Sequence, residues 1–265
     1  VVFDKTGTLT EGRPVFEMVF ALAPHGEDEV LRLAASLDQG SEHPLAEAIV
    51  RAAKDKGMTL SKVDGFESAT GIGVRGRVDG KRLSLGNTAL MAEDNATADS
   101  ATQARAEALR LGGASVMSLA IDGQFAGLLA VSDPVKESTP AALKALQDTG
   151  IRIIMATGDG LTTAKSVGQR LGINEVHGEV KPAEKLALVE RLQAQGLIVA
   201  MAGDGINDAP ALAKADVGIA MGTGTDVAMN SAQVTLVKGD LRGIATTREL
   251  SNATIANMKQ NLWFA

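Results

Sequence analysis

Hydrophobic positions in the second half of the chain predict a parallel α/β fold. From about residue 150 onward, short apolar runs typical of buried strands alternate with amphipathic segments of helical period. The predicted strands cover residues 151–157, 197–203 and 216–221, and the predicted helices cover residues 161–172, 182–196 and 207–215. Pro182 stands in the first turn of its helix and Gly196 just past its end, as is usual at helix boundaries. Such alternation favours one parallel sheet with helices on both faces, to which the apolar run at residues 1–3 adds a strand.

The middle of the chain has a different pattern and predicts an inserted α+β unit with an antiparallel sheet. Alternating strands surround two Asp-Gly pairs, Asp79-Gly80 and Asp122-Gly123, and such pairs are strong hairpin signals. Amphipathic helices are predicted at residues 27–38, 44–56 and 98–111. We therefore expect a discontinuous α/β domain at residues 1–20 and 132–265, interrupted by a second domain at residues 21–131. The second boundary lies near Pro134, which breaks the periodicity.

Composition narrows the function. The formal net charge of −6 argues against nucleic acid as a partner, because phosphate binding needs a basic face. The absence of cysteine excludes disulfides and thiolate metal sites within these residues. No apolar run reaches the length that crosses a bilayer. The chain begins inside a strand and ends on an apolar run in a long helix predicted at residues 241–265, so we expect a fragment of a larger protein.

Polar residues follow the predicted parallel strands where those strands end. Four such stretches occur, at residues 4–8, 157–159, 181–185 and 203–208. Carboxyl ends of parallel strands meet at one edge of a sheet, so Asp4, Asp204 and Asp208 are expected to lie close together. Three neighbouring carboxylates ionise only if a cation sits among them, and Mg²⁺ prefers such oxygen ligands. Thr157 and Lys185 are suited to hold phosphoryl oxygens, which predicts phosphoryl transfer to an aspartate.

Simpler interpretations exist for each stretch alone. Asp4 could be a turn residue before glycine, and residues 203–208 could be a loop of turn formers; a calcium loop is excluded because its spaced ligands and terminal glutamate are missing. The Gly-rich residues 71–76 do not fit a dinucleotide fingerprint, because a hairpin and not a helix follows them. His43, before Pro44 at a helix start, could cap that helix or, as a neutral imidazole, contact an adenine.

In combination, DKTGTLT (residues 4–10), TGD (157–159) and GDGINDAP (203–210) resemble the P-type ATPases, cation pumps of the haloacid-dehalogenase-like superfamily. The resemblance implies that ATP phosphorylates Asp4 and that Mg²⁺ is held by Asp4, Asp204, Asp208 and the backbone of Thr6. It further implies that Thr157 and Lys185 contact the phosphoryl group. Further site residues implied in this domain are Asn207, Gly158 and Asp159. Related phosphatases carry an acid/base aspartate where Thr6 stands, so the acyl phosphate here should be long-lived.

The stretch SEHPLA (residues 41–46) resembles the nucleotide-binding signature of heavy-metal-transporting members. That resemblance implies an ATP pocket in the inserted domain, formed by Glu42, His43, Gly71, Gly73, Gly86 and Asn87. The ending KQNLWFA is most similar to the copper(I) branch, although the Tyr-Asn pair of that branch does not appear, so zinc or cadmium export remains the alternative. A soluble phosphatase of the same superfamily and a nucleotide-binding regulatory module are less favoured.

The same resemblance sets the expected surroundings. It implies ATP and Mg²⁺ as cofactors, with the actuator and transmembrane domains of the full-length protein as partners. The transported ion would bind outside this fragment. The fragment is expected at the cytoplasmic face of a membrane protein, most simply in a bacterial plasma membrane.

Overall fold

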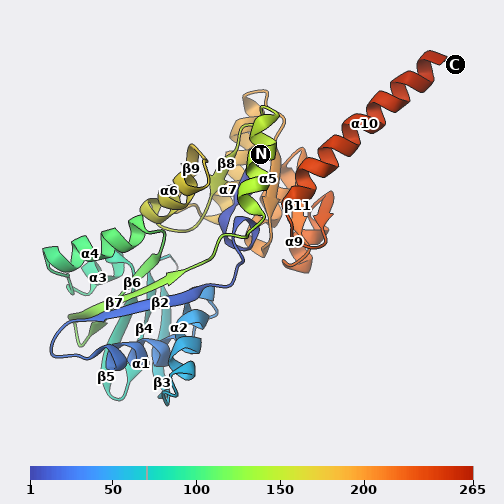
Figure 1. The fold of residues 1–265 in the computed structure, drawn as a ribbon. Helices are drawn as coiled ribbons and strands as arrows, with labels where there is room; N and C mark the ends of the chain where they lie inside the picture. The colour runs from blue at the N-terminus through green and yellow to red at the C-terminus, as the bar shows by residue number, and fades with distance from the viewer. Residues whose placement is uncertain (70, 265) are drawn as a thin grey trace. The chain divides into compact units, whose positions relative to one another are not determined.

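The chain folds into two compact units (Figure 1). The computed structural model describes residues 1–69 and 71–264. One unit, here the parallel-sheet unit, comprises Val1–Glu11 and Val135–Ala265, and the other, the antiparallel-sheet unit, comprises Gly12–Pro134. The expected fold class, a parallel α/β domain with an inserted antiparallel α+β domain, is confirmed.

The parallel-sheet unit contains a six-stranded sheet in the order β12-β11-β10-β1-β8-β9, with every pairing parallel. The strands are β1 (Val2–Asp4), β8 (Ile154–Ala156), β9 (Glu175–His177), β10 (Ala200–Gly203), β11 (Val217–Met221) and β12 (Val234–Leu236). The helices are α5 (Thr139–Asp148), α6 (Leu161–Arg170), α7 (Pro182–Ala194), α8 (Ala209–Lys214), α9 (Asp226–Asn230) and α10 (Arg242–Phe264). Successive residues of β1 point to opposite faces: Phe3 packs in a core with α5, α6 and α10, and Val2 in a core with α7 and α8.

Several predicted elements of this unit are shorter in the structure. β10 begins at Ala200 and not at residue 197, because Leu197 and Ile198 are exposed and only the following residues enter the sheet. Residues 207–215 divide into a 3₁₀ turn, Ile206–Asp208, and the short helix α8. The long C-terminal helix is present as α10, while its predicted last residue, 265, lies outside the described residues.

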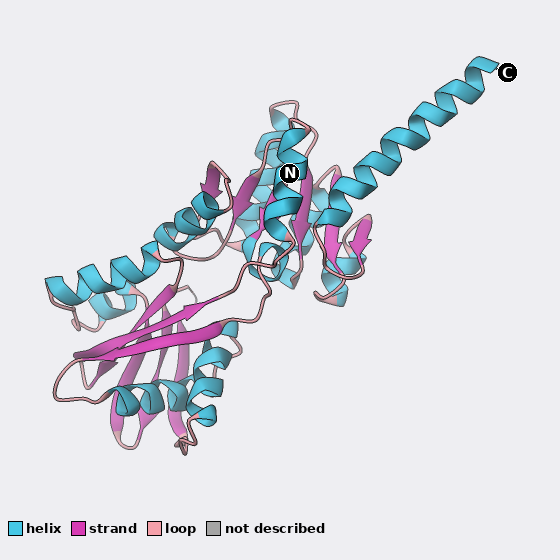
Figure 2. Cartoon of the chain, viewed as in Figure 1, coloured by secondary structure: helices cyan, strands magenta, loops and turns pink. Residues whose placement is uncertain are grey.

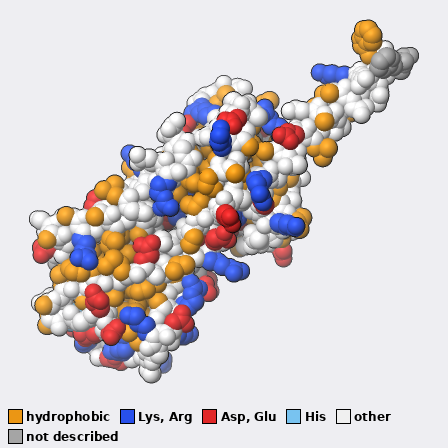
Figure 3. Space-filling model, in the orientation of Figure 1, with side chains coloured by type: hydrophobic (Ala, Val, Ile, Leu, Met, Phe, Trp, Pro, Cys, Tyr) orange, Lys and Arg blue, Asp and Glu red, His pale blue; other side chains and the backbone are white. Residues whose placement is uncertain are grey.

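The last helix carries apolar side chains that do not pack against the rest of the unit. Leu250, Ile255, Met258 and Leu262 are all exposed along α10, and Figure 3 shows apolar side chains on this projecting segment. Among the described residues, no helix combines the length and the apolar character needed to span a bilayer.

The antiparallel-sheet unit contains a six-stranded sheet in the order β2-β7-β6-β5-β4-β3 (Figure 2). The strands are β2 (Val15–Ala21), β3 (Val63–Ala69), β4 (Gly73–Val78), β5 (Lys81–Gly86), β6 (Ser115–Ile121) and β7 (Gln124–Ser132), and the helices are α1 (Glu27–Asp38), α2 (Pro44–Asp55), α3 (Thr88–Glu93) and α4 (Ser100–Leu111). Both predicted hairpins are present. Asp79-Gly80 and Asp122-Gly123 have positive φ at both positions, as a type I′ turn requires.

The first boundary between the units differs from the expected one. We expected the α/β domain to extend to residue 20, but β2 pairs with β7 from Val15↔Ser132 to Ala21↔Gly127 and so belongs to the antiparallel sheet. The chain passes between the units at Glu11–Gly12 and at Pro134–Val135. The pattern of residues 15–21 alone could not assign this strand, because its partner β7 lies more than 100 residues later (124 − 21 = 103).

Candidate active site

Asp4 stands at the carboxyl edge of the parallel sheet because β1 ends there. Val2 and Phe3 are fully buried in the centre of the sheet, between β8 and β10. The chain then reverses through residues 5–9, where Gly7 takes φ +72°. Thr10 closes this loop, since its N–H and its hydroxyl both donate to the Lys5 carbonyl at 3.1 and 2.9 Å. The loop of residues 4–10 therefore holds the Asp4 carboxyl at the edge where ligands bind in such sheets.

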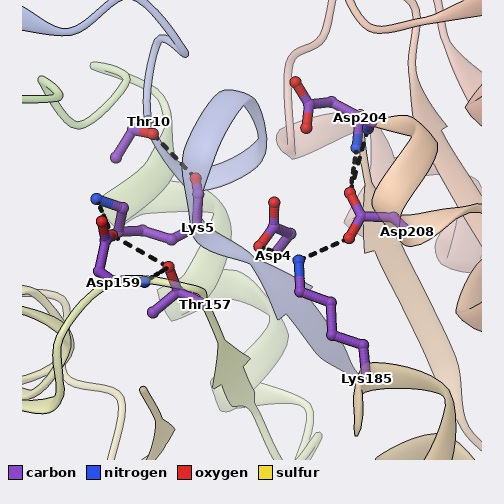
Figure 4. A network of polar contacts seen from close by, with 9 residues as sticks. Asp4, Lys5, Thr10, Thr157, Asp159, Lys185, Asp204 and Asp208 are labelled. Carbon is purple, nitrogen blue, oxygen red and sulfur yellow. Dashed lines mark hydrogen bonds and ion pairs between the residues drawn. The ribbon is translucent and has the colours of Figure 1, made fainter. Parts of the chain in front are cut away.

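Three carboxyl groups converge at this edge (Figure 4). One oxygen each from Asp4, Asp204 and Asp208 lies within 4.8 Å of the others. Asp204 directly follows β10, and Asp208 ends the short turn after it. Asp208 Oδ2 also accepts hydrogen bonds from the backbone N–H groups of Asp204 and Gly205, both at 3.2 Å, which fixes the loop. The proximity expected from the sequence is present.

Lys185 bridges two of these carboxyl groups from the first turn of α7. Its Nζ donates to Asp4 Oδ1 at 2.6 Å and to Asp208 Oδ1 at 2.7 Å. A lysine is unfavourable at the positive end of a helix dipole, so the two carboxylates must stabilise it there. Burial favours the neutral amine, but the charges of Asp4 and Asp208 outweigh it and raise the pKa of Lys185. The ammonium is therefore charged at neutral pH.

One ammonium does not balance three carboxylates. Burial raises the pKa of Asp4 to about 7 against the opposing attraction of Lys185. Burial, together with the charge of Asp208, raises the pKa of Asp204 to about 6. Near neutral pH the cluster holds back a proton that isolated aspartates would release. The site thus favours an additional positive charge.

Mg²⁺ fits this donor set. The cluster offers only oxygen ligands, which lie within 4.8 Å of one another, and oxygen is the ligand type that Mg²⁺ prefers. A bound divalent cation would replace the retained proton and lower the carboxyl pKa values. Thr6, whose backbone was expected to add a ligand, lies half-buried in the loop beside Asp4.

Thr157 and Asp159 form a separate contact next to the cluster. Thr157 is buried at the end of β8; its hydroxyl donates to Asp159 Oδ2 at 3.1 Å and accepts from the Asp159 N–H at 3.2 Å. Asp159, expected to bind the nucleotide, forms an ion pair here with Lys5. The sequence analysis did not single out Lys5, although a buried lysine beside an acidic cluster needs its own anion. Gly158 and Asn207 are exposed at the same edge.

In the antiparallel-sheet unit, four of the expected nucleotide-site residues meet in one place. Gly73 pairs with Gly86 across β4 and β5, and a Cβ on Gly73 would lie 2.3 Å from the Leu85 carbonyl. Asn87 caps α3 by accepting from the N–H groups of Ala89 and Leu90, and its Nδ2 donates to the Gly71 carbonyl at 3.0 Å. Gly73 and Gly86 are thus required by strand contact. Gly71, at φ +81° with open space on its Cβ side, leaves its backbone accessible.

His43 caps α2. Its Nδ1 accepts from the Leu45 N–H at 3.2 Å, which requires a neutral ring with the proton on Nε2. The capping interpretation is therefore correct as far as Nδ1 is concerned, and it does not exclude a contact through the ring face or Nε2. The preceding Glu42 and the ring of His43 are exposed. The loop that carries them runs beside β3, since a Cβ on Gly40 would lie 2.7 Å from the Phe66 ring.

Asp38 is a candidate residue that the sequence analysis missed. It ends α1, five residues before His43, and its side chain is buried, yet Oδ2 has no hydrogen-bond partner among the described residues. Burial raises the pKa of Asp38 to about 7. The sequence held one signal, because a carboxylate at the negative end of a helix dipole is unfavourable without a reason.

Asp38→Asn is expected to alter the pH dependence of stability. The folded state keeps the Asp38 proton up to about pH 7, while an unfolded aspartate releases it near 3.8, so this residue lowers the free energy of unfolding as pH rises through that window. The amide mimics the protonated acid. Denaturant unfolding should therefore show that Asp38→Asn is more stable than the wild type, and this gain should grow between pH 5 and pH 8 by on the order of 1–3 kcal/mol. Asp28→Asn, at an exposed position of the same helix, is the control. An Asp38→Asn curve parallel to that of the wild type from pH 5 to 8 would contradict the assignment.

The family model for haloacid dehalogenase-like hydrolases matches residues 1–216. The chain belongs to this family. A copper-transporting P-type ATPase of Rhizobium leguminosarum bv. viciae is 55% identical over 265 residues, which are 100% of this chain and 31% of that protein. A silver exporting P-type ATPase of Salmonella typhimurium is 52% identical over 265 residues, again 100% of this chain and 32% of the relative.

Solved structures of similar proteins agree with this placement. The catalytic domain of the CPx-ATPase CopB-B matches with a TM-score of 0.71 and 32% identity, covering 93% of this chain and 86% of that one. A zinc-transporting PIB-type ATPase matches with a TM-score of 0.71 and 35% identity, covering 98% of this chain and 42% of that one. The expected resemblance to heavy-metal P-type ATPases is confirmed, and the chain spans about a third of the length of these curated relatives.

Proposed function

We propose that this haloacid dehalogenase-like chain accepts the γ-phosphoryl group of ATP on Asp4 as part of a copper(I)-exporting P-type ATPase. The observation that carries the proposal is the convergence of Asp4, Asp204 and Asp208 around Lys185 at one edge of the sheet. This edge combines a nucleophile, carboxylates for a divalent cation and a fixed ammonium for phosphoryl oxygens.

The residues of the cluster divide the chemistry among them. An Asp4 oxygen attacks the γ-phosphorus, a new P–O bond forms, the bond to the β-phosphate oxygen breaks, and ADP leaves. Lys185 stays charged, fixes the Asp4 carboxylate and neutralises charge on the transferring group. Asp204 and Asp208, with the Thr6 carbonyl, would hold Mg²⁺, which supplies further charge neutralisation when bound. Thr157, Gly158 and Asn207 flank the same edge, and the Thr157 hydroxyl is available to the phosphoryl group once it leaves Asp159.

The acyl phosphate should persist because the loop has no general base at Thr6. A threonine hydroxyl is not a base at neutral pH, so attack by water on the Asp4 phosphate lacks proton transfer from this position. In a pump, an actuator domain would supply that base at a later step. Persistence favours a transport intermediate over a soluble phosphatase.

Labelling separates this function from its rivals. The full-length protein, incubated with Mg²⁺ and ATP and quenched in acid, should retain label from γ-labelled and not from α-labelled ATP, and hydroxylamine should release it. A phosphatase would release phosphate without a persistent label. A regulatory module would bind both nucleotides and retain neither label.

We infer that the nucleotide base binds in the antiparallel-sheet unit. The open backbone at Gly71, which Asn87 holds in place, and the His43 loop beside β3 support this location, with Gly73 and Gly86 shaping the turn and Glu42 at its rim. A flat aromatic base can approach glycine backbone closely and stack on an imidazole.

Two substitutions separate the capping role of His43 from ligand contact. Asparagine is a good helix cap without an aromatic ring, so His43→Asn should keep the melting temperature. Both His43→Asn and His43→Gln should weaken ATP binding, measured by calorimetry, by roughly tenfold, which corresponds to about 1.4 kcal/mol. His25→Gln, at a histidine that hydrogen-bonds Glu29 in the same unit, is the control. Unchanged ATP affinity in His43→Asn would show that the His43 ring does not contact the nucleotide.

The proposed cargo is copper(I). Support comes from the relatives, whose names include copper transport at 55% identity and silver export at 52%. A zinc-transporting structure at 35% identity keeps zinc or cadmium as the alternative. We place the chain at the cytoplasmic face of a bacterial plasma membrane, joined to actuator and transmembrane domains that bind the ion. ATP hydrolysis by the full-length protein should be stimulated by copper(I) more than by zinc; preferential stimulation by zinc would reassign the cargo.

A further inference from the structure

The segment that enters the parallel-sheet unit at Val135 is bonded directly to the Asp4 loop. Val135 forms a β-bridge with Thr10. The N–H of Lys136 donates to the Leu9 carbonyl at 3.1 Å, and the hydroxyl of Thr139 donates to the same carbonyl at 2.8 Å. The end of the loop that carries Asp4 and the start of α5 are thereby fixed to each other.

The side chain of Lys136 extends this connection to the last helix. Its Nζ donates to the Gly7 carbonyl at 2.8 Å and to the Gly239 carbonyl at 3.1 Å. Gly7 lies within the Asp4 loop, and Gly239 lies in the turn between β12 and α10. Both glycines have positive φ, +72° and +62°, and a Cβ on Gly239 would lie 2.9 Å from the Thr223 hydroxyl. One ammonium group therefore joins two tightly packed turns that are 232 residues apart in sequence (239 − 7).

The Gly239 turn sets the start of α10. Asp240 accepts from the Arg242 N–H at 2.9 Å and pairs with its guanidinium, which lowers the pKa of Asp240 to about 2. Gly243, in the first turn of α10, packs so closely on β12 that a Cβ there would lie 2.9 Å from Leu236. A shift of the Gly239 carbonyl would therefore move the first turn of α10 with it.

Lys136 is also connected to the carboxylate cluster through Gly7. Its Nζ donates to the Gly7 carbonyl, and Gly7 packs directly on Asp204, since a Cβ on Gly7 would lie 1.8 Å from Asp204 Oδ2. Phosphorylation of Asp4 would replace one carboxylate by a group of about two negative charges and so change the force on this ammonium. The Lys136 ammonium thus contacts both the Asp4 loop and the turn before α10, so it links the phosphorylation site physically to the start of that helix.

We propose that Lys136 is a positioning residue that transmits the phosphorylation state of Asp4 to the start of α10. The proposal rests on the proposed function, since it needs a phosphoryl group at Asp4. Its components are the two carbonyl contacts of the Lys136 ammonium and the close packing of Gly7 on Asp204. In this arrangement, a change at Asp4 draws Lys136 and the Gly7 carbonyl together, and the Gly239 turn follows.

Hydrogen–deuterium exchange of the 265-residue chain tests the proposal, with Mg²⁺ and beryllium fluoride as the phosphoryl mimic. In the wild type, the mimic should slow exchange at residues 5–10 and, by at least threefold, at residues 237–247. In Lys136→Met, slowing should persist at residues 5–10 and fall below 1.5-fold at residues 237–247; Lys136→Arg should retain part of it. Lys144→Met, at an exposed lysine of α5, should behave as the wild type.

The outcomes separate this inference from the proposed function. Slowing of residues 5–10 without slowing of residues 237–247 in the wild type overturns the transmission and leaves phosphorylation of Asp4 intact. Equal slowing of residues 237–247 in Lys136→Met overturns the role of Lys136. No slowing at residues 5–10 in the wild type contradicts the phosphoryl site itself and the inference with it. If Lys136→Met fails to fold, the wild-type measurement still decides the transmission, and Lys136→Arg tests the role of Lys136, which slowing equal to that of the wild type at residues 237–247 would overturn.

Discussion

Replacing Asp4 with asparagine is expected to reduce the acid-stable label from γ-labelled ATP by roughly 10³-fold or more, to background. An amide cannot form the acyl phosphate, whereas its shape and its contact with Lys185 Nζ through the amide oxygen can be kept. The buried, carboxyl-lined position of Asp4 makes this loss specific to the nucleophile. The measurement is acid-quenched labelling of the full-length protein with Mg²⁺ present.

The control for this substitution is Asp216→Asn. Asp216 accepts from the Val199 N–H at 2.8 Å near the amino end of β10, at the opposite end of that strand from Asp204, so its removal should leave labelling within about twofold. ATP binding to the antiparallel-sheet unit should be unchanged in both variants. A hydroxylamine-sensitive label that persists in Asp4→Asn would reject the assigned nucleophile.

Gly7→Ala is expected to disrupt the proposed Mg²⁺ site, because the added methyl group would clash with Asp204. A Cβ on Gly7 would lie 1.8 Å from Asp204 Oδ2, and the backbone there has φ +72°, which side chains rarely adopt. Asp204 must therefore leave its position close to Asp4 and Asp208, or the loop must move away with Asp4. We expect Mg²⁺ affinity, measured by calorimetry, and phosphoenzyme formation each to fall by roughly 10²-fold or more.

Gly172→Ala is the control that separates the effect of the clash with Asp204 from the effect of backbone strain. Gly172 has φ +68°, and nothing lies within 4 Å of its Cβ position, so Gly172→Ala carries a comparable strain of about 1–3 kcal/mol without a clash. Both variants should lose similar stability to strain, but only Gly7→Ala should lose Mg²⁺ binding. Equal Mg²⁺ affinities in the two variants would show that the packing of Gly7 against Asp204 does not shape the site.

The sequence predicted the fold class and the convergence of the acidic residues, and it did so for one physical reason. If apolar strands are parallel, the polar residues that follow them lie at the same edge of the sheet. The sequence therefore predicted that Asp4 and Asp204 lie close together, although they are 200 residues apart in the chain. The two Asp-Gly hairpins could also be predicted, because the residues of the turn themselves favour the positive φ angles that the turn needs at two successive positions.

Features that depend on distant partners could not be predicted. β2 has a strand pattern, but its sheet is decided by β7. Lys5 and Asp159 pair across 154 residues (159 − 5), and neither residue signals the other. Asp38 ends an amphipathic helix, and only the packing around it makes its carboxyl buried. Lys136 follows the interdomain proline, and its contacts with two glycine carbonyls could not be predicted from the hydropathy pattern.

If ATP converts Asp4 to a mixed anhydride with phosphate, chemical mapping must find the modification at this residue. Borohydride converts an aspartyl phosphate to homoserine, so mass spectrometry of the reduced, ATP-treated full-length protein should find homoserine at position 4 in the wild type. Homoserine at another aspartate, or a retained label with Asp4 unmodified, would show that Asp4 is not the residue that is phosphorylated.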